Sequence, residues 1–246
     1  MADPLFSLQG RCVVVAGASR GIGLALAEGL ARQGAAVVGF GRTAAVAVEG
    51  FQYHCCDLND GAALEALLER ICAGHGAIDA YIHVAGITVP AGDGLQGVEQ
   101  FEQTLNVNLV AAYRACRSVG LRMAAAGGGS IVTVASIGAL QAFPGNPGYV
   151  AAKGGLRMMS KSLALDLGPS GVRVNSLLPG YFRTEMTEQS YQDPDKRAAR
   201  AGRTMLGRWG RVEELIGAAA FLASDASSYV TGSDLIVDGG WSAKGL

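Results

Sequence analysis

Tyr149 and Lys153 are spaced so that a phenol and an ammonium group lie close together. They stand four residues apart in a helix-period segment, Tyr149–Leu167, which places them one turn apart on the same helix face. A free tyrosine has a pKa of about 10, too high for a base at neutral pH, and a neighbouring cation favours the phenolate. Pro147-Gly148 indicates a helix N-terminus just before Tyr149, whose dipole acts in the same direction. The pair is therefore a candidate for exchanging a proton with a substrate.

A glycine-rich turn near the start of the chain is a candidate phosphate-binding site. It reads Ala16-Gly17-Ala18-Ser19-Arg20-Gly21-Ile22-Gly23 and lies between an apolar run and a helix-period segment. A diphosphate needs backbone N–H groups with no Cβ in the way, and the N-terminus of a helix supplies them with a favourable dipole. The glycine spacing is GxxxGxG rather than GxGxxG. The strand–turn–helix context favours a dinucleotide site over a purely structural turn.

The elements that would position these residues alternate along the chain. Seven short apolar runs predict strands at Cys12–Ala16, Ala36–Phe40, Phe51–Cys56, Asp79–Val84, Ser130–Ala135, Val172–Leu178 and Leu235–Val237. Five segments with helical periodicity separate most of them: Ile22–Gln33, Ala62–Ala73, Val98–Ala126, Tyr149–Leu167 and Val212–Ala223. This alternation predicts a parallel sheet covered by helices on both faces. No linker or repeat divides the chain, so we expect a single domain over residues 1–246.

Two connections depart from this regularity. The stretch Arg42–Gly50 is too short for a crossover helix, so a loop or single turn is expected there. The stretch Tyr181–Arg208 is polar, follows a strand end and carries several arginines. It predicts a mobile substrate lid at about 181–208, with short helices.

Composition excludes several classes of protein. Hydrophobic residues make up 50% of the 246 residues and charged residues 17%, with a net charge of −1, so neither nucleic acid nor an anionic membrane surface is an expected partner. The start of the chain lacks a signal-peptide pattern, and the uncharged segment 127–152 holds too many Gly, Pro and polar residues to span a membrane. The five cysteines show no CxxC spacing, so reduced, buried thiols, no metal site and a cytoplasmic location are expected.

Several motifs, in this order, resemble those of the short-chain dehydrogenase/reductases. They are Gly17-Ala-Ser-Arg-Gly-Ile-Gly23, Asn106-Val-Asn108-Leu, Ser136 thirteen residues before Tyr149, Tyr149-Val-Ala-Ala-Lys153 and Pro179-Gly180-Tyr-Phe-Arg-Thr184. The similarity extends from Leu8 to the ending Val237-Asp-Gly-Gly-Trp241. It implies an α/β fold, a Rossmann-like, doubly wound, seven-stranded parallel sheet of order 3-2-1-4-5-6-7 with helices on both faces. It also implies a homotetramer.

The resemblance implies an NAD(P)-dependent oxidoreductase that moves a hydride between the cofactor and an alcohol/ketone pair. Tyr149 would exchange the proton, and Ser136 would donate a hydrogen bond to the substrate oxygen as charge develops. Lys153 would also bind the nicotinamide ribose. Asn108 would hold a water that extends a proton relay behind Lys153.

The resemblance also assigns cofactor contacts along the carboxyl ends of the strands. Ala85 and Gly86 permit close approach to a ribose, while the backbone of Phe182 and the side chain of Thr184 would meet the carboxamide and diphosphate. Asp57 and Leu58 would meet the adenine, although an aspartate at a strand end is often a helix cap. The full set of expected cofactor residues is Gly17, Ser19, Arg20, Gly21, Ile22, Gly23, Arg42, Thr43, Asp57, Leu58, Ala85, Gly86, Tyr149, Lys153, Pro179, Gly180, Phe182 and Thr184.

The chain departs from the family pattern at two places. Ala16 stands where the family usually has Thr, which removes a hydroxyl that ties down the phosphate loop. His83-Val84 replaces the usual Asn-Asn before Ala85 and Gly86. His83 could form hydrogen bonds in their place, but a histidine at a strand end is more often structural, and it is assigned no catalytic role.

The region after the second strand indicates which nicotinamide is bound. An NAD enzyme would carry an acid about twenty residues past the first glycine. Here the sequence is Val37-Val-Gly-Phe-Gly-Arg42-Thr43, with no acid. Arg42 could fork onto a 2′-phosphate, aided by Thr43 and Arg20, so NADP(H) is favoured over NAD(H). The alternative is that both arginines are solvated surface groups.

The sequence indicates less about the substrate than about the reaction and the cofactor. The stretch Gly180–Thr187 and the tail from Gly207 to Trp241 resemble bacterial gluconate and deoxygluconate dehydrogenases, which favours a small polar, sugar-acid-like ketone or secondary alcohol. Arg183, Arg203 or Gln141 could recognise a carboxylate or hydroxyls. A 3-oxoacyl-thioester reductase is the alternative enzyme. A non-catalytic dinucleotide-sensing protein on the same fold is the alternative from another class.

Overall fold

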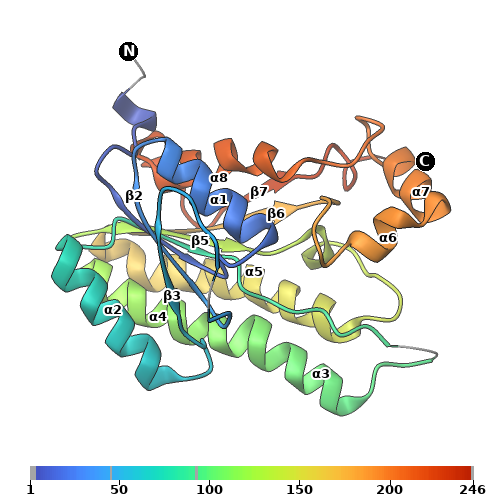
Figure 1. The fold of residues 1–246 in the computed structure, drawn as a ribbon, viewed down its shortest axis with the longest axis horizontal. Helices are drawn as coiled ribbons and strands as arrows, with labels where there is room; N and C mark the ends of the chain where they lie inside the picture. Colours follow the sequence, from blue (N-terminus) through green and yellow to red (C-terminus); the bar gives the residue numbers. More distant parts are fainter. Residues whose placement is uncertain (1–3, 45, 92–93, 245–246) are drawn as a thin grey trace.

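One parallel sheet of seven strands forms the centre of the molecule, in a computed structural model that describes residues 4–44, 46–91 and 94–244 (Figure 1). The strand order is β3-β2-β1-β4-β5-β6-β7, as the sequence predicts, and all neighbours run parallel. The strands are β1 (Cys12–Ala16), β2 (Ala36–Gly41), β3 (Gln52–Cys55), β4 (Ala80–His83), β5 (Gly129–Val134), β6 (Val172–Pro179) and β7 (Asp234–Val237). No predicted strand end is wrong by more than one residue.

Helices cover both faces of the sheet, which explains why the strands are apolar without alternation (Figure 1). Val14 packs into a core with helices α2, α4 and α5, whereas Val13 and Val15 pack into a second core with α1 and α8. These helices are α1 (Gly21–Arg32), α2 (Gly61–His75), α4 (Ala111–Ala125), α5 (Pro147–Leu167) and α8 (Ile216–Ala223). Short 3-10 turns are η1 (Pro4–Phe6), η3 (Ile137–Ala139), η4 (Gly168–Ser170), η5 (Val212–Leu215) and η6 (Asp225–Ser227).

The segment predicted as one helix over Val98–Ala126 is interrupted. It consists of α3 (Val98–Leu105), a π-helical turn η2 (Asn106–Val110) and α4. Hydrophobic periodicity continues across this turn, so the sequence gives no signal of it. A π turn inserts an extra residue and re-aims side chains, and such turns occur often at functional sites.

The two irregular connections have the expected character. Between β2 and β3, the described residues 42–44 and 46–51 form neither helix nor strand. After β6, the stretch 181–208, called the lid below, contains the predicted short helices, α6 (Glu188–Gln192) and α7 (Pro194–Arg203), which stand at one end of the molecule (Figure 1).

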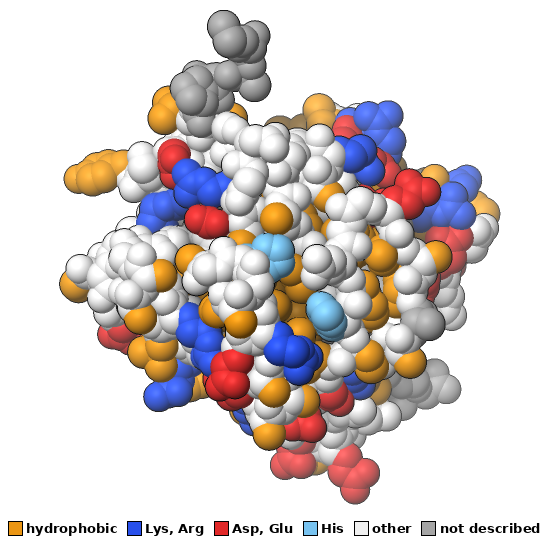
Figure 2. Space-filling view, turned by 60° about the vertical axis from the view of Figure 1, so that its left-hand side comes forward, with side chains coloured by type: hydrophobic (Ala, Val, Ile, Leu, Met, Phe, Trp, Pro, Cys, Tyr) orange, Lys and Arg blue, Asp and Glu red, His pale blue; other side chains and the backbone are white. Residues whose placement is uncertain are grey.

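Helix hydropathy, surface charge and the cysteines can be compared with the sequence. Within the described ranges, no helix is long and apolar enough to cross a membrane. Basic and acidic side chains are intermixed on the face shown in Figure 2. All five cysteines are free, but Cys55 is exposed, so the expectation that the thiols are buried is wrong for that residue.

Candidate active site

The phosphate loop is a turn with no room for side chains at two of its glycines. A Cβ on Gly17 would lie 2.7 Å from the backbone nitrogen of Ala85, and a Cβ on Gly23 would lie 2.0 Å from the carbonyl oxygen of Gly17. Gly17 also has a positive φ of 87°, which favours glycine. The loop therefore packs the start of α1 against the ends of β1 and β4.

The N-terminus of α1 is open, unlike that of α2. Arg20 occupies the N-cap position of α1 and makes no side-chain cap hydrogen bond, and its first turn has no acidic residue. In α2 the carboxylate of Asp60 accepts a hydrogen bond from the backbone nitrogen of Ala63 at 3.0 Å. The uncapped backbone donors of α1 are suited to a diphosphate, so this end of the chain fits a dinucleotide.

Backbone groups hold the phosphate loop where the family's threonine hydroxyl is missing. Gly17 and Ala18 both donate N–H groups to the carbonyl of Phe40, at 2.8 and 3.2 Å. The carbonyl of Ala16 accepts N–H groups from Val84 and Ala85, at 2.9 and 3.0 Å. The alanine at position 16 therefore leaves the loop bonded to β2 and to the end of β4.

The structure brings Ser136, Tyr149 and Lys153 together at the carboxyl end of β5. Ser136 follows the strand, and its Oγ accepts the N–H of Gly138 at 3.0 Å. Lys153 Nζ donates to the carbonyl of Val134 at 2.8 Å and lies 5.8 Å from the centre of the Tyr149 ring. Ser136 and Lys153 are 8% and 4% exposed, so the two groups are almost dry.

Burial has the largest influence on the Tyr149 phenol. It raises the pKa of Tyr149 above its usual value, the hydrogen bond with Ser136 lowers it, and the nearby Tyr181 raises it. Burial also lowers the pKa of Lys153 to about 8. That Lys153 and a positively charged nicotinamide ring together favour the phenolate stays a prediction.

Asn108 lies in the π-helical turn, fully buried beside Lys153. Its side chain accepts the N–H of Ile87 at 2.7 Å and donates to the carbonyl of Ile87 at 2.8 Å. A Cβ on Gly86 would lie 3.2 Å from Asn108 Oδ1 and 3.7 Å from Lys153 Nζ. The turn thus fixes the chain after β4 against both side chains, and the amide of Asn108 keeps a second N–H for the water that the resemblance implies.

His83 is fully buried at the end of β4. Its Nδ1 lies 2.9 Å from the hydroxyl of Tyr81, and its Nε2 has no hydrogen-bond partner among the described residues. Burial and the charge of Lys153 lower the pKa of His83 to about 3, so the ring is neutral. These contacts fit the structural role expected from the sequence.

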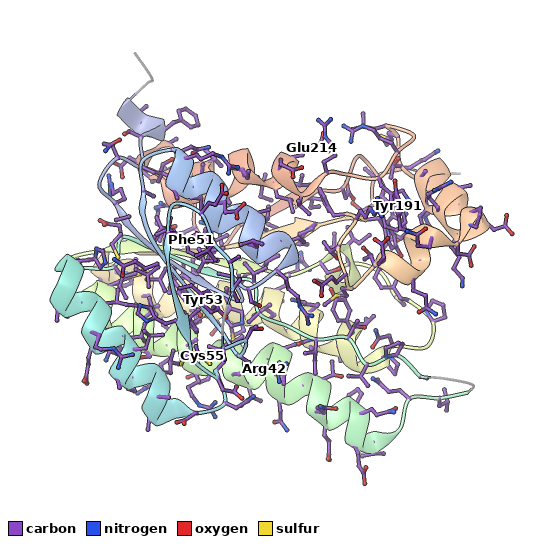
Figure 3. All side chains as sticks on the ribbon, viewed as in Figure 1. Arg42, Phe51, Tyr53, Cys55, Tyr191 and Glu214 are labelled. Carbon is purple, nitrogen blue, oxygen red and sulfur yellow. The ribbon has the colours of Figure 1, made fainter. Side chains whose placement is uncertain are left out.

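Arg42 and Arg20 lie in different surroundings, although both were expected at the 2′-phosphate. Arg42 is exposed after β2 and lines a cleft of about 520 Å³ with Asn59, Arg114 and residues of α3, and its position is labelled in Figure 3. Arg20 instead forms an ion pair with Glu185 of the lid, at 2.7 Å. This ion pair is exposed to solvent, and the contact of Arg20 with a 2′-phosphate stays a prediction.

Tyr53 links Ser19 and Thr43, and the sequence analysis missed it. Its hydroxyl donates to the carbonyl of Thr43 at 3.1 Å. Burial raises the pKa of Tyr53, whereas a hydrogen bond with Ser19 lowers it. A tyrosine in a short strand such as β3 has no distinctive signal in the sequence, so only the fold reveals this bridge.

The expected adenine contacts are only partly available. Leu58 is 8% exposed and packs into the core beside the sheet, and its contact with the adenine stays a prediction. The carboxylate of Asp57 accepts hydrogen bonds from the backbone and side-chain nitrogens of Asn59, at 2.9 and 3.2 Å. Its carboxylate stabilises a turn, as the structural alternative allowed, while Asp60 is the helix cap.

Thr187 organises the nicotinamide end, and the sequence analysis missed it too. Its hydroxyl donates to the carbonyl of Phe182 at 2.6 Å and accepts the N–H of Thr184 at 3.0 Å. Pro179 ends β6, and Gly180 donates to the carbonyl of Val237 at 3.0 Å. Phe182 and Thr184 are therefore placed by a threonine pair spaced three residues apart.

A cluster of aromatic rings joins the lid to the segments after β5 and β7. Neighbouring rings have centroids 5.2 to 6.3 Å apart; the aromatic cluster consists of Phe143, Tyr181, Tyr191, Trp209 and Trp241. Three arginines of α7, at positions 197, 200 and 203, lie over these rings. Figure 3 shows Tyr191 among the side chains beside α6 and α7. Through Phe143, the cluster reaches the loop that begins at Ser136.

Comparison with known proteins agrees with this geometry. The family described as "Enoyl-(Acyl carrier protein) reductase" matches residues 17–242. A gluconate 5-dehydrogenase of Gluconobacter oxydans is 41% identical over 251 residues, covering 98% of both proteins. A 3-oxoacyl-(acyl-carrier-protein) reductase of Escherichia coli is 35% identical, covering 95% of this chain and 98% of that protein.

A solved structure is similar over almost the whole fold. It is a gluconate 5-dehydrogenase from Burkholderia cenocepacia J2315 in complex with NADP and tartrate, with a TM-score of 0.93 and 35% identity, covering 98% of this chain and 99% of that one. Fold, motif order and sequence identity agree over the same residues. The chain therefore belongs to the short-chain dehydrogenase/reductase family of oxidoreductases.

Proposed function

We propose that this oxidoreductase interconverts a secondary alcohol and a ketone on a small polar, sugar-acid-like substrate, with Tyr149 as the general acid and base and NADP(H) as the cofactor. The observation that supports this most strongly is the grouping of Ser136, Tyr149 and Lys153 after β5, where Ser136 and Lys153 are buried and Lys153 Nζ lies 5.8 Å from the centre of the Tyr149 ring. The gluconate dehydrogenases among its relatives support the substrate class.

The residues of the chain handle the oxygen and its proton. When bound, the nicotinamide supplies or accepts the hydride. In the direction of reduction, Tyr149 gives its proton to the substrate oxygen as negative charge develops there. Ser136 Oγ accepts the N–H of Gly138 and shares a hydrogen bond with Tyr149, so its hydroxyl would turn from the phenol to the same substrate oxygen. Lys153, held by the carbonyl of Val134, is positioned to bind the ribose and to favour the phenolate.

The raised pKa of Tyr149 fits the acid role at neutral pH. In the direction of oxidation the phenol must first lose its proton, which a positively charged nicotinamide ring would favour. We therefore expect the rate of alcohol oxidation to rise from pH 7 to alkaline pH, and carbonyl reduction to change less over the same range. Steady-state rates in both directions across this range test the assignment.

The decisive experiment follows NADPH oxidation with a panel of carbonyl compounds. Tyr149→Phe should lower kcat by roughly 10²- to 10⁴-fold while leaving the binding of NADPH unchanged, because only the proton transfer is removed. An unchanged kcat in this variant would refute the mechanism. Tight cofactor binding without turnover of any substrate by the unaltered protein would instead favour the dinucleotide-sensing alternative.

The preference for NADP(H) rests on Arg42 and Thr43. Neither the phosphate loop nor the end of β2 offers an acid to a 2′-hydroxyl, and Arg42 stands exposed at a cleft. A guanidinium there forms charge-assisted hydrogen bonds to a 2′-phosphate. Titrating the protein with NADPH and with NADH should give the lower Kd for NADPH, and equal values would refute the preference.

We further propose that the chain is cytoplasmic and forms a homotetramer through α4 and α5. Apolar side chains on these helices and on the preceding turn η2 stay exposed, among them Val110 at 47%, Tyr113 at 48% and Met158 at 62%. Contiguous exposed apolar surface of this kind commonly marks an interface. Sedimentation should give four copies, and Met158→Lys should reduce that number. A monomer at all concentrations would contradict the assembly.

A 3-oxoacyl-thioester reductase is the second candidate, favoured by the 35% identity to the Escherichia coli protein. Both candidates use the same proton transfer, so Tyr149→Phe does not separate them. The ratio of kcat/KM for a keto sugar acid and for a 3-oxoacyl thioester does.

A further inference from the structure

Some arginines of the lid have carboxylate partners and others do not. Arg183 is bonded to Glu188 at 2.8 Å and Arg208 to Glu214 at 2.7 Å. Arg197, Arg200 and Arg203 form no ion pair with any described residue. They recur every three residues along α7, so they share one side of the helix.

Arg200 is the most confined of the three. Its guanidinium carbon lies 4.7 Å from the centre of the Tyr181 ring and 5.9 Å from that of Trp209. Its Nη1 atom is buried and has no hydrogen-bond partner among the described residues. Stacking on aromatic rings stabilises the cation, but it does not satisfy the buried N–H groups. An acceptor from outside the chain would.

A second buried donor without a partner lies around the same ring. Trp241 has its ring centroid 5.9 Å from that of Tyr181, and its Nε1 is buried with no partner among the described residues. Arg203 stacks over Trp241 at 4.3 Å and reaches the side-chain oxygen of Gln141 at 3.4 Å. Around Tyr181 the unsatisfied groups are therefore donors, and two of the neighbours are cations.

This donor set lies next to the reacting groups. A Cβ on Gly138 would lie 2.9 Å from the ring of Phe143 and 3.4 Å from Ser136 Oγ, so Phe143 packs beside the catalytic serine. Phe143 and Gln141 belong to the loop that begins at Ser136, and Phe143 contacts Tyr181 at 6.3 Å. A small substrate held at Tyr149 would therefore extend toward Arg200 and Trp241.

We infer that Arg200, aided by the indole N–H of Trp241, binds the carboxylate of the substrate and makes the site selective for hydroxy- and oxo-carboxylates. A carboxylate only accepts hydrogen bonds and can take two parallel N–H groups from a guanidinium. It would satisfy both buried donors and give Arg200 the carboxylate partner that it does not have among the described residues. The inference rests on the proposed function and names the residue that selects its substrates.

The test compares two substrates that differ only in charge at one end: an aldonate such as gluconate, and the alditol with the same number of carbons. In Arg200→Met, KM for the aldonate should rise roughly 10- to 100-fold with kcat little changed, while the alditol is unaffected. Arg200→Lys should recover part of the loss. Trp241→Phe, which removes only the indole donor from the ring contact, should raise KM for the aldonate several-fold.

Arg197→Met is the matched control. Arg197 lies one turn away from Arg200, and its guanidinium stacks over the ring of Tyr191, at 5.5 Å, whereas that of Arg200 stacks over Tyr181. It should change KM for both substrates less than twofold. Equal losses on aldonate and alditol in Arg200→Met would overturn the inference.

Binding separates failure of this inference from failure of the proposed function. With NADPH present, gluconate should raise the melting temperature of the unaltered protein and of Arg197→Met, but not that of Arg200→Met. If this pattern holds without any turnover, the carboxylate site stands and the reaction is wrong. If gluconate is turned over but stabilises all three proteins equally, the reaction stands and the role of Arg200 is wrong.

Discussion

The catalytic floor (His83, Asn108, Ser136 and Lys153) and the lid hold their polar groups in different ways. In the floor, Lys153 and Asn108 bond to backbone groups of Val134 and Ile87 and are buried. In the lid, charged side chains bond to one another or stack on rings at the surface. Backbone partners cannot move without the sheet, whereas side-chain pairs can re-form around a ligand.

This difference suggests a division of labour. The floor holds the chemistry that a whole family can share, because its geometry follows from strand ends and one helix. On the proposals above, the lid would hold the contacts that distinguish substrates, because its arginines and rings come from connecting segments that tolerate change. Substitutions in the floor should therefore alter kcat or stability, and substitutions in the lid should alter KM.

Lys153→Met should have the largest effect and should separate activity from stability. We expect kcat to fall roughly 10²- to 10⁴-fold, because the ammonium that favours the phenolate is lost. Stability at pH 7 should rise, by up to about 3 kcal/mol, since burial lowers the pKa of Lys153 to about 8 and its charged form is costly in the fold.

The pH dependence gives the sign of this effect. Between the folded pKa of about 8 and the unfolded value of about 10.5, the unfolded chain binds the extra proton, so the unaltered protein gains stability as pH rises. Urea unfolding at several pH values should show the advantage of Lys153→Met shrinking across this window. A variant that is less stable than the parent at pH 7 would mean that the bond to Val134 outweighs desolvation.

His83→Asn should affect stability rather than catalysis. The folded pKa of His83 is lowered to about 3 by burial, against 6.5 ordinarily, so acid protonates the unfolded chain first. The stability of the unaltered protein is complete above pH 6.5 and falls as the pH drops toward 3. Relative to the asparagine variant, the loss at pH 5 should be about 2 kcal/mol. If the free energies of unfolding of the two proteins change in parallel with pH, His83 takes up its proton as readily in the fold as in the unfolded chain.

The contrast between floor and lid also explains how far the sequence could predict the molecule. The strands, the phosphate loop and the pair Tyr149–Lys153 follow from local patterns: short uninterrupted apolar runs, helices with a period of 3.6 residues, and fixed spacings. The π-helical turn at Asn108 leaves the apolar periodicity intact, so the sequence predicts one straight helix there. The partner of Arg20 could not be predicted either, because Glu185 lies 165 residues away.

The aromatic cluster was the least predictable part of the site. Phe143, Tyr181, Trp209 and Trp241 come from segments after β5, β6 and β7 that meet only in the folded chain. The sequence drew attention to Arg203, Arg183 and Gln141, but not to Arg200. An arginine within a polar helix looks solvated until its neighbours are known, and its burial against Tyr181 is a tertiary property.

Glu188→Gln should have the smallest effect and so marks the limit of the comparison. Its carboxylate pairs with Arg183, and that hydrogen bond lowers the pKa of Glu188 to about 2. The pair is fully exposed to screening by water and salt, and such pairs contribute little to stability. At pH 7 we expect kcat, KM and the melting temperature all to stay close to those of the parent.

The same variant tests whether the lid's ion pairs take part in binding. Any contribution of Glu188 to the free energy of unfolding is complete above its ordinary pKa of 4.5 and disappears as the pH falls toward 2. A stability difference between parent and variant that is present at pH 7 and lost in strong acid would therefore measure this ion pair. A KM for an aldonate that fell in Glu188→Gln at pH 7 would mean that Arg183, once released, also reaches the carboxylate. Selectivity would then belong to the lid's arginines jointly, and the separate role of Arg200 would have to be measured in the double variant.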